Sequence, residues 1–245
     1  MEATEVRKLA ELEDRHWWYT ERRALLRRMT RAGTRAGVAL DVGAAGGGNT
    51  RVLRALGLRA VAVEYGAEGA GVAKARGLAV VRGDAGALPF GAGIADLVVA
   101  FDVLEHLRDD GAALREFRRV LRPGGRLLVA VPADMTLWSA HDEAVGHVRR
   151  YTREGLVAAV AGAGFAVETV RSWNVLLRPL VRLRRRFSTG SDLSRLPAAI
   201  NGLLRAVVVV ERVLPGTRSR RGVSLLLTAQ AGSVPSARLS AARAR

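Results

Sequence analysis

Two acidic residues in the N-terminal half of the sequence have a spacing that suits binding of a ribose-containing ligand. Asp41 lies in a short apolar run, and Glu64 ends a second apolar run 23 positions later. The turn between them, 43–48, holds only small residues, and a helical pattern follows it. Small residues let a ligand approach the backbone, and the helix start presents free N–H groups to it. An acid about 20 residues after such a turn can accept hydrogen bonds from a ribose diol. The alternative for the turn alone is a tight strand-to-helix connection that binds nothing.

A second group of reactive side chains lies within 141–151, where two histidines, two acids, two arginines and a tyrosine occur in eleven residues. A neutral imidazole with a pKa near 6.5 can accept a proton from a hydroxyl group. His141 is therefore the first candidate for a general base, with His106 and His147 behind it. The alternative is structural: His147 is a hydrogen-bonded turn residue, beside a salt-bridge network of Asp142, Arg149 and Arg150.

The elements that would position these residues belong to an α/β fold, because short apolar runs alternate with helical patterns. Strands are predicted at 38–42, 59–64, 78–82, 95–100, 126–131 and about 165–171. Helices are predicted at 2–14, 19–35, 111–120 and 153–162. In open α/β sheets, ligands bind beyond the carboxyl ends of the strands. That edge would hold Phe101, Asp102, Glu105 and His106, which follow the fourth strand.

With these motifs in order, the sequence resembles the class I S-adenosylmethionine-dependent methyltransferases, in their type 11, ubiquinone-methyltransferase-like small-molecule branch. The matching motifs are Leu40-Asp41-Val42-Gly43, Glu64, Gly83-Asp84-Ala85 with Leu88-Pro89-Phe90, the string 96–107, and Leu121-Arg122-Pro123-Gly124-Gly125. The resemblance implies a seven-stranded, Rossmann-like sheet that is mostly parallel, with helices on both faces. It also implies a last, antiparallel strand, which would be 223–229. The chain departs from the family at Ala45, where a second glycine is usual, and alanine fits such a turn if φ stays negative.

By the same resemblance, the cofactor is S-adenosyl-L-methionine and the product is S-adenosyl-L-homocysteine. Asp84 would accept the adenine amino group, and the Ala85 N–H would face a ring nitrogen; the alternative is that Asp84 is an ordinary turn aspartate. The cofactor-binding residues expected are Asp41, Gly43, Ala45, Gly47, Glu64, Tyr65, Asp84, Ala85, Phe101, Trp18 and Arg22. The pattern Asp102-x-x-Glu105-His106 is also similar to one that some ubiquinone-pathway O-methyltransferases use for a divalent cation. Because the same string occurs in methyltransferases without a metal, metal dependence stays unknown at this point, and Glu105 as a helix N-terminal acid is the alternative.

Composition excludes some classes of function. The absence of cysteine excludes disulfides, a thiolate metal site and a cysteine nucleophile. The N-terminus has no secretory signal pattern, and no apolar run reaches the roughly 18 residues of a membrane span. The formal net charge is +16, of which residues 171–245 contribute +13. This excess indicates attraction to anionic lipid, phosphate or nucleic acid, although an arginine-rich composition from a GC-rich coding sequence is an equal alternative.

Four parts of the chain are expected. Residues 1–36 form an N-terminal helical lid around the aromatic knot 16–19, and the resemblance implies that Arg22 or Arg23 lies near the methionine carboxylate. The alternative is that the knot is a plug that packs the N-terminal helices onto the domain. Residues 37–172 and 222–230 form the methyltransferase core, and 231–245 is a disordered tail. Residues 173–221 form a basic, apolar helical cap, with an apolar helix at 196–214. The cap covers the substrate or forms a dimer contact, and a peripheral contact with the membrane is the added hypothesis.

The sequence predicts a methyltransferase that O-methylates a small-molecule, natural-product or lipid-linked acceptor by in-line transfer. It would be a cytoplasmic biosynthetic enzyme, peripheral at the inner face of the membrane if the cap binds lipid. Nucleic acid is not the expected partner, since no Asn-Pro-Pro-Tyr-like motif is present. The alternatives left open are an RNA or DNA methyltransferase, a nicotinamide dehydrogenase and a non-catalytic cofactor-binding protein. The acceptor, the atom methylated and the oligomeric state do not follow from the sequence.

Overall fold

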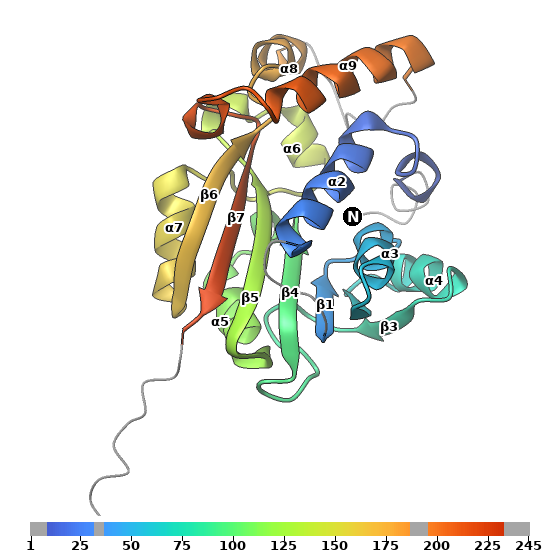
Figure 1. The fold of residues 1–245 in the computed structure, drawn as a ribbon, viewed down its shortest axis with the longest axis vertical. Coiled ribbons are helices and arrows are strands. Elements are labelled where there is room, and N and C mark those ends of the chain that lie inside the picture. Colours follow the sequence, from blue (N-terminus) through green and yellow to red (C-terminus); the bar gives the residue numbers. More distant parts are fainter. Residues whose placement is uncertain (1–8, 32–36, 187–195, 233–245) are drawn as a thin grey trace, which may run out of the picture.

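The computed structural model describes residues 9–31, 37–186 and 196–232. Its centre is a seven-stranded sheet with the strand order β3-β2-β1-β4-β5-β7-β6 (Figure 1). The strands are β1 (Val38–Val42), β2 (Arg59–Glu64), β3 (Ala79–Arg82), β4 (Ala95–Phe101), β5 (Leu121–Pro132), β6 (Phe165–Trp173) and β7 (Ser224–Ala231). Strands β1 to β5 pair in parallel, and β7 runs antiparallel to both of its neighbours. The predicted fold class is confirmed.

Helices cover both faces of the sheet because consecutive strand residues point to opposite sides. Leu40 packs in one core with α5 (Asp110–Val120) and α7 (Arg153–Gly162). Ala39 packs in the opposite core with α2 (Trp17–Arg31) and α3 (Gly48–Ala55). Helix α4 (Ala67–Ala75) packs beside β3 through Ala73 and Leu78. The central strands are therefore buried on both faces, which explains their uninterrupted apolar sequences.

Several predicted boundaries are wrong. The aromatic knot is part of α2, which begins at Trp17, because Trp17 and Trp18 pack against the cap. Strand β5 begins at Leu121, five residues before the predicted start. Ala231 belongs to β7, where it pairs with Phe165, and so is not part of the tail. Residues 9–12 are helical as predicted, whereas 1–8, 32–36, 187–195 and 233–245 lie outside the described residues.

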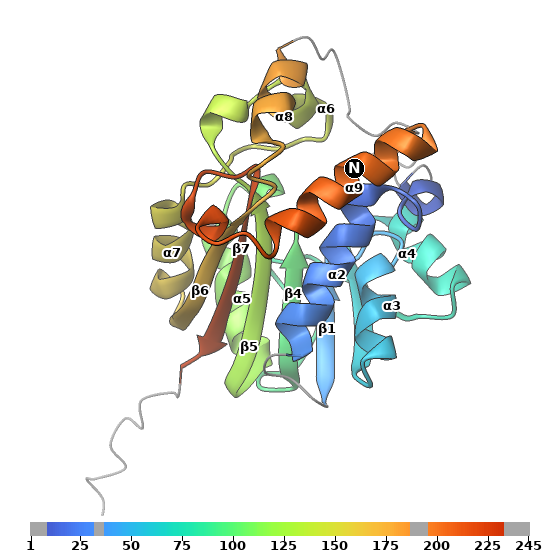
Figure 2. The ribbon, with the colours of Figure 1, turned by 45° about the horizontal axis from the view of Figure 1, so that its top comes forward.

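The cap consists of α8 (Arg178–Arg185) and α9 (Ala198–Glu211), and it covers the carboxyl ends of the strands (Figure 2). Helix α9 crosses α2, and α8 lies beside the short α6 (Ala140–Ala144). The carboxylate of Glu21, which is 1% exposed, pairs with Arg205 and Arg212. The Asn201 side chain accepts a hydrogen bond from the Trp17 N–H at 2.8 Å and donates one to the Arg15 carbonyl at 3.0 Å. These contacts join the N-terminal helix to the cap.

Candidate functional site

The turn after β1 lets a ligand approach its backbone closely. Gly43 and Gly47 have φ values of 69° and 80°, which glycine adopts at no steric cost. Ala45 has a φ of 46°, so the negative φ at which alanine would fit this turn without strain is not what the structure shows. Its N–H donates to Oε2 of Glu64 at 2.7 Å, and Oε1 of Glu64 accepts from the Gly66 N–H at 2.9 Å. The turn and the acid at the end of β2 therefore hold each other in place.

Asp41 lies beneath this turn. Its side chain is 1% exposed, and Oδ2 accepts a hydrogen bond from the Thr50 hydroxyl at 2.6 Å. Burial raises the pKa of Asp41 to about 7. The side chain fixes the first turn of α3 against β1, so its contribution to a bound ligand would be to position the backbone.

The remaining residues predicted to hold the nucleoside lie at the neighbouring strand ends. Glu64 pairs in register with Arg82, and the Gly83 N–H donates to the Glu64 carbonyl at 3.2 Å. The turn with Asp84 and Ala85 therefore adjoins the end of β2. The carboxylate of Asp84 accepts from the Gly86 N–H at 2.8 Å. At the end of β2, the Tyr65 side chain is 73% exposed.

A cavity of about 320 Å³ begins at the turn and extends under the cap. At the sheet it is lined by the turn 43–45 and by Phe101 and Asp102. All three candidate bases line it as well, at positions His106, His141 and His147. Its apolar wall comes from the cap and the N-terminal helix, through Trp17, Trp18, Leu177, Leu180 and Leu204. The predicted residues outside the cavity lining are Asp41, Gly47, Glu64, Tyr65, Asp84 and Ala85.

Arg22 reaches the cavity from α2 and is 3% exposed. It forms an ion pair with Asp102. The centre of its guanidinium lies 5.1 Å from the ring centroid of Phe101, 5.8 Å from that of Trp18 and 5.4 Å from that of Trp173. These distances are within the range of cation–π attraction. The structure thus brings together Trp18, Arg22 and Phe101, whereas Trp173 was not predicted at the site.

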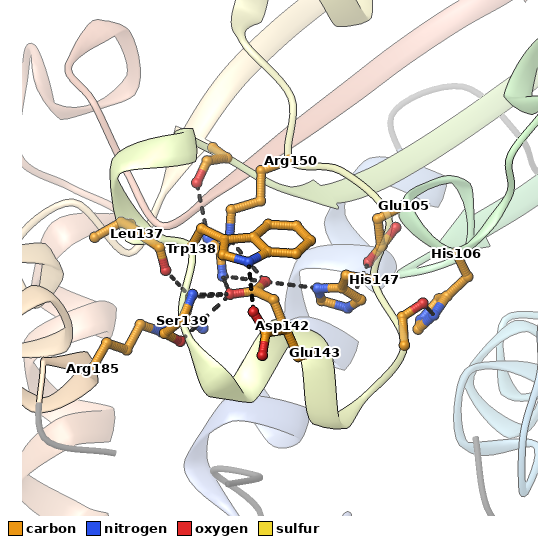
Figure 3. A network of polar contacts seen from close by, with 12 residues as sticks. Glu105, His106, Leu137, Trp138, Ser139, Asp142, Glu143, His147, Arg150 and Arg185 are labelled. Carbon is orange, nitrogen blue, oxygen red and sulfur yellow. Dashed lines mark hydrogen bonds and ion pairs between the residues drawn. The ribbon is translucent and has the colours of Figure 1, made fainter. Parts of the chain in front are cut away.

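The loop between β5 and α7 is organised around Asp142, whose side chain is fully buried (Figure 3). This carboxylate accepts from Arg150 Nε at 2.8 Å and Nη2 at 3.1 Å, and from the Ser139 N–H at 3.0 Å. It also lies 2.8 Å from Nδ1 of His147 and 3.3 Å from Nη1 of Arg185 on α8. The structural alternative is confirmed for Asp142 and Arg150, and the same network reaches the cap.

Arg149 also forms a structural ion pair, but its partner is Asp110 at 3.0 Å rather than Asp142. The Tyr151 hydroxyl donates to the same carboxylate of Asp110 at 2.5 Å. Burial and this acid raise the pKa of Tyr151 above its usual value. Tyr151 is therefore a neutral hydrogen-bond donor that holds the loop against α5.

The three histidines form a row. The ring centroids of His106 and His147 are 4.8 Å apart, and those of His141 and His147 are 6.2 Å apart. Burial and the neighbouring His147 lower the pKa of His106, so its imidazole is neutral near pH 7. Glu105 is fully buried beside them, and burial together with the charge of Asp102 raises its pKa.

The structure rearranges the predicted cation pattern. Glu105 and His106 lie together as predicted, but their third neighbour with a ligand atom is His147. Asp102, the first member of the pattern, pairs with Arg22 instead. Nothing in the sequence connects His147 to Glu105, because 42 positions separate them and the contact depends on the path of the loop. The alternating leucines and arginines of 173–187 were the available signal for the cap residues in the cavity wall.

Comparisons with known proteins agree with this geometry. A family model described as a methyltransferase domain matches residues 40–129. A demethylmenaquinone methyltransferase of Mycobacterium tuberculosis is 30% identical over 167 residues, which is 66% of this chain and 68% of that protein. A probable S-adenosylmethionine-dependent methyltransferase of the same species is 26% identical over 166 residues, covering 66% of this chain and 60% of that protein.

Solved structures share the fold. A chain in the complex between the Haloferax volcanii Trm112 methyltransferase activator and a putative methyltransferase has a TM-score of 0.66 and 23% identity, covering 94% of this chain and 96% of that one. Phosphoethanolamine N-methyltransferase 2 of Haemonchus contortus, in complex with S-adenosyl-L-methionine, has a TM-score of 0.61 and 18% identity, covering 87% of this chain and 53% of that one. With the strand order, the glycine turn and the acid that ends β2, these relatives place the chain among the class I S-adenosylmethionine-dependent methyltransferases, and S-adenosylmethionine is its cofactor.

Proposed function

We propose that this methyltransferase O-methylates a small, partly apolar acceptor, either free or lipid-linked. The observation that carries the proposal is the single cavity that joins the turn 43–45 to a row of histidines under an apolar roof. The apolar wall suits a hydrophobic acceptor, and an imidazole within the same cavity suits a hydroxyl that must lose a proton. The name of the relative from Mycobacterium tuberculosis points to a small-molecule acceptor as well.

In this proposal the cofactor lies across the ends of β1, β2 and β3. Glu64 would accept hydrogen bonds from the ribose hydroxyls. Backbone donors at the turn hold both of its oxygens in place, and each oxygen keeps a second lone pair for the ligand. Asp84 and the backbone of Ala85 would bind the adenine edge. Arg22 would bind the methionine carboxylate: its Nη1 is buried and has no hydrogen-bond partner among the described residues. A carboxylate there would give this donor a charge-assisted hydrogen bond.

Methyl transfer from a sulfonium is an in-line displacement in which the cofactor supplies the leaving group. The protein must therefore align the acceptor, exclude water and receive the proton. Trp17 and Trp18 would exclude water, because they close the cavity between α2 and the cap. His141 is the proposed base, since it lines the cavity from α6 and belongs to a short helix next to the cap. His106 and His147 are the second choices for this role.

The cap supports a lipid-linked acceptor. Leu183 on α8 is 55% exposed, and Leu203 on α9 is 65% exposed. The described cap residues, 173–186 and 196–221, include ten arginines and one acid, Glu211. Exposed leucines among arginines are typical of a surface that rests on anionic lipid. None of the helices in the described ranges is long and apolar enough to cross a membrane. The proposal is a cytoplasmic enzyme that contacts the inner face of the membrane through the cap.

The test uses tritiated S-adenosylmethionine with a panel of apolar phenols, alcohols and lipid-linked glycans. We expect transfer to a hydroxyl, and we expect His141→Ala to lower kcat by about 10²- to 10⁴-fold. Calorimetry should give the same cofactor Kd for both proteins, because His141 lies outside the proposed nucleoside site. Full turnover by His141→Ala would remove this base from the mechanism. Transfer to nitrogen or carbon acceptors alone would refute O-methylation.

A further inference from the structure

Glu105, His106 and His147 bring one carboxylate and two imidazoles together in the wall of the cavity. One ligand-type atom of each lies within 4.8 Å of the others. Nε2 of His147 is 3.8 Å from Oε1 of Glu105, and the three side chains converge in Figure 3. Two imidazoles and a carboxylate form a donor set that binds transition metals and leaves open positions for other ligands.

Each imidazole is oriented through its other nitrogen. Nδ1 of His147 lies 2.8 Å from Oδ1 of Asp142, and Nδ1 of His106 lies 3.2 Å from the carbonyl of Gly146. Both partners are acceptors, so the tautomer with its proton on Nδ1 fits them, and this tautomer leaves the Nε2 lone pair available to a metal. Metal-binding histidines are held in this way, with the outer nitrogen donating to a carboxylate or a carbonyl.

Glu105 gives a second, independent observation. Its side chain is fully buried, and neither of its oxygens accepts a hydrogen bond from any described residue. Burying a carboxylate without a partner is unfavourable, and such groups in proteins are usually paired or bound to a metal. Asp102 differs, because it forms an ion pair with Arg22.

We infer that Glu105, His106 and His147 bind a divalent transition metal ion whose open positions face the acceptor. The ligand set differs from the linear Asp102-x-x-Glu105-His106 pattern, because His147 takes the place of the aspartate. Imidazole ligands favour ions such as Zn²⁺ and Co²⁺, whereas Mg²⁺ favours oxygen ligands. Binding of the ion is independent of the proposed function. Its use rests on that function: the ion would lower the pKa of an acceptor hydroxyl that approaches it.

The experiment titrates chelator-treated full-length protein with CoCl₂ and follows the visible absorption of Co²⁺. We expect one ion per chain, and an excess of MgCl₂ should not displace it. Loss of a ligand in Glu105→Gln, His106→Ala or His147→Ala should weaken binding by at least about 100-fold. Two matched variants of the same cavity, Asp102→Asn and His141→Ala, should bind Co²⁺ as the wild type does.

Far-UV circular dichroism and a thermal melt on each preparation identify the variants that are folded. The inference is overturned if the wild type binds the cofactor but no Co²⁺. It is also overturned if a folded His147→Ala variant binds Co²⁺ normally, or if Asp102→Asn loses the ion while His147→Ala keeps it. A protein that binds Co²⁺ but methylates no hydroxyl would refute the proposed O-methylation and leave the metal site standing.

Discussion

Replacing Ala45 by glycine should stabilise the protein. Ala45 has a φ of 46°, a left-handed conformation that costs an L-residue with a Cβ about 1–2 kcal/mol. Glycine adopts this conformation freely, but it also gives the unfolded chain more conformational entropy, which costs about 0.4–1 kcal/mol. The difference predicts that Ala45→Gly raises the free energy of unfolding by about 0.8 kcal/mol.

The assay is urea denaturation with a parallel thermal melt. For a chain of this size, the predicted change corresponds to a rise in Tm of about 2 °C. The matched control is Ala158→Gly, at an exposed position inside α7. Glycine in a helix interior is less favourable than alanine by about 1 kcal/mol, so the two substitutions should have opposite signs. If Ala45→Gly destabilises the protein as Ala158→Gly does, the argument from backbone strain is wrong.

Three further predictions concern the cofactor, the membrane and pH. Glu64→Gln should raise the Kd for S-adenosylmethionine roughly ten- to a hundredfold in calorimetry, since hydrogen bonds to a charged acceptor are lost; an unchanged Kd would contradict the ribose assignment. Leu203→Asp should abolish co-sedimentation with vesicles that contain anionic lipid, whereas Ile94→Asp, at a 41% exposed position outside the cap, should not. Because the folded-state pKa of Asp41 is raised to about 7 from 3.8, its stabilising contribution is complete below pH 4 and is lost as the pH rises to about 7. Between pH 4 and pH 7 the wild type should therefore lose up to about 4 kcal/mol of its free energy of unfolding through Asp41, and Asp41→Asn should not show this loss in urea denaturation. If the free energy of unfolding changes with pH equally in both proteins, this prediction is refuted.

The core of the fold was predictable because local sequence and tertiary structure agree there. Helix α7 has the predicted bounds, since Thr152 accepts a hydrogen bond from the Gly155 N–H at 3.0 Å and caps the helix. The start of α2 was not predictable. It depends on Asn201, which bonds the Trp17 N–H across 184 positions of sequence, and a local pattern carries no information about such a contact.

The candidate site divides in the same way. The turn after β1 and Glu64 form a motif in which spacing along the chain reflects position in the fold. Arg22 and Asp102 are 80 positions apart, and Glu105 meets His147 only because the loop after β5 folds back over β4. Sequence patterns could predict these residues individually, but which of them are in contact depends on the path of the chain through the fold.

The contacts of Glu21 with Arg205 and Arg212 have a consequence for the order of turnover. Since α2 and α9 are fastened to each other, a displacement of one would carry the other with it. Cofactor exchange and acceptor entry would then depend on the same movement of α2 and α9, which would act as a single gate. Neither ligand would leave while the other stayed enclosed in the cavity. Product-inhibition kinetics that show random, independent release would contradict this coupling. A gate of that kind would keep water away from the sulfonium while both substrates are bound.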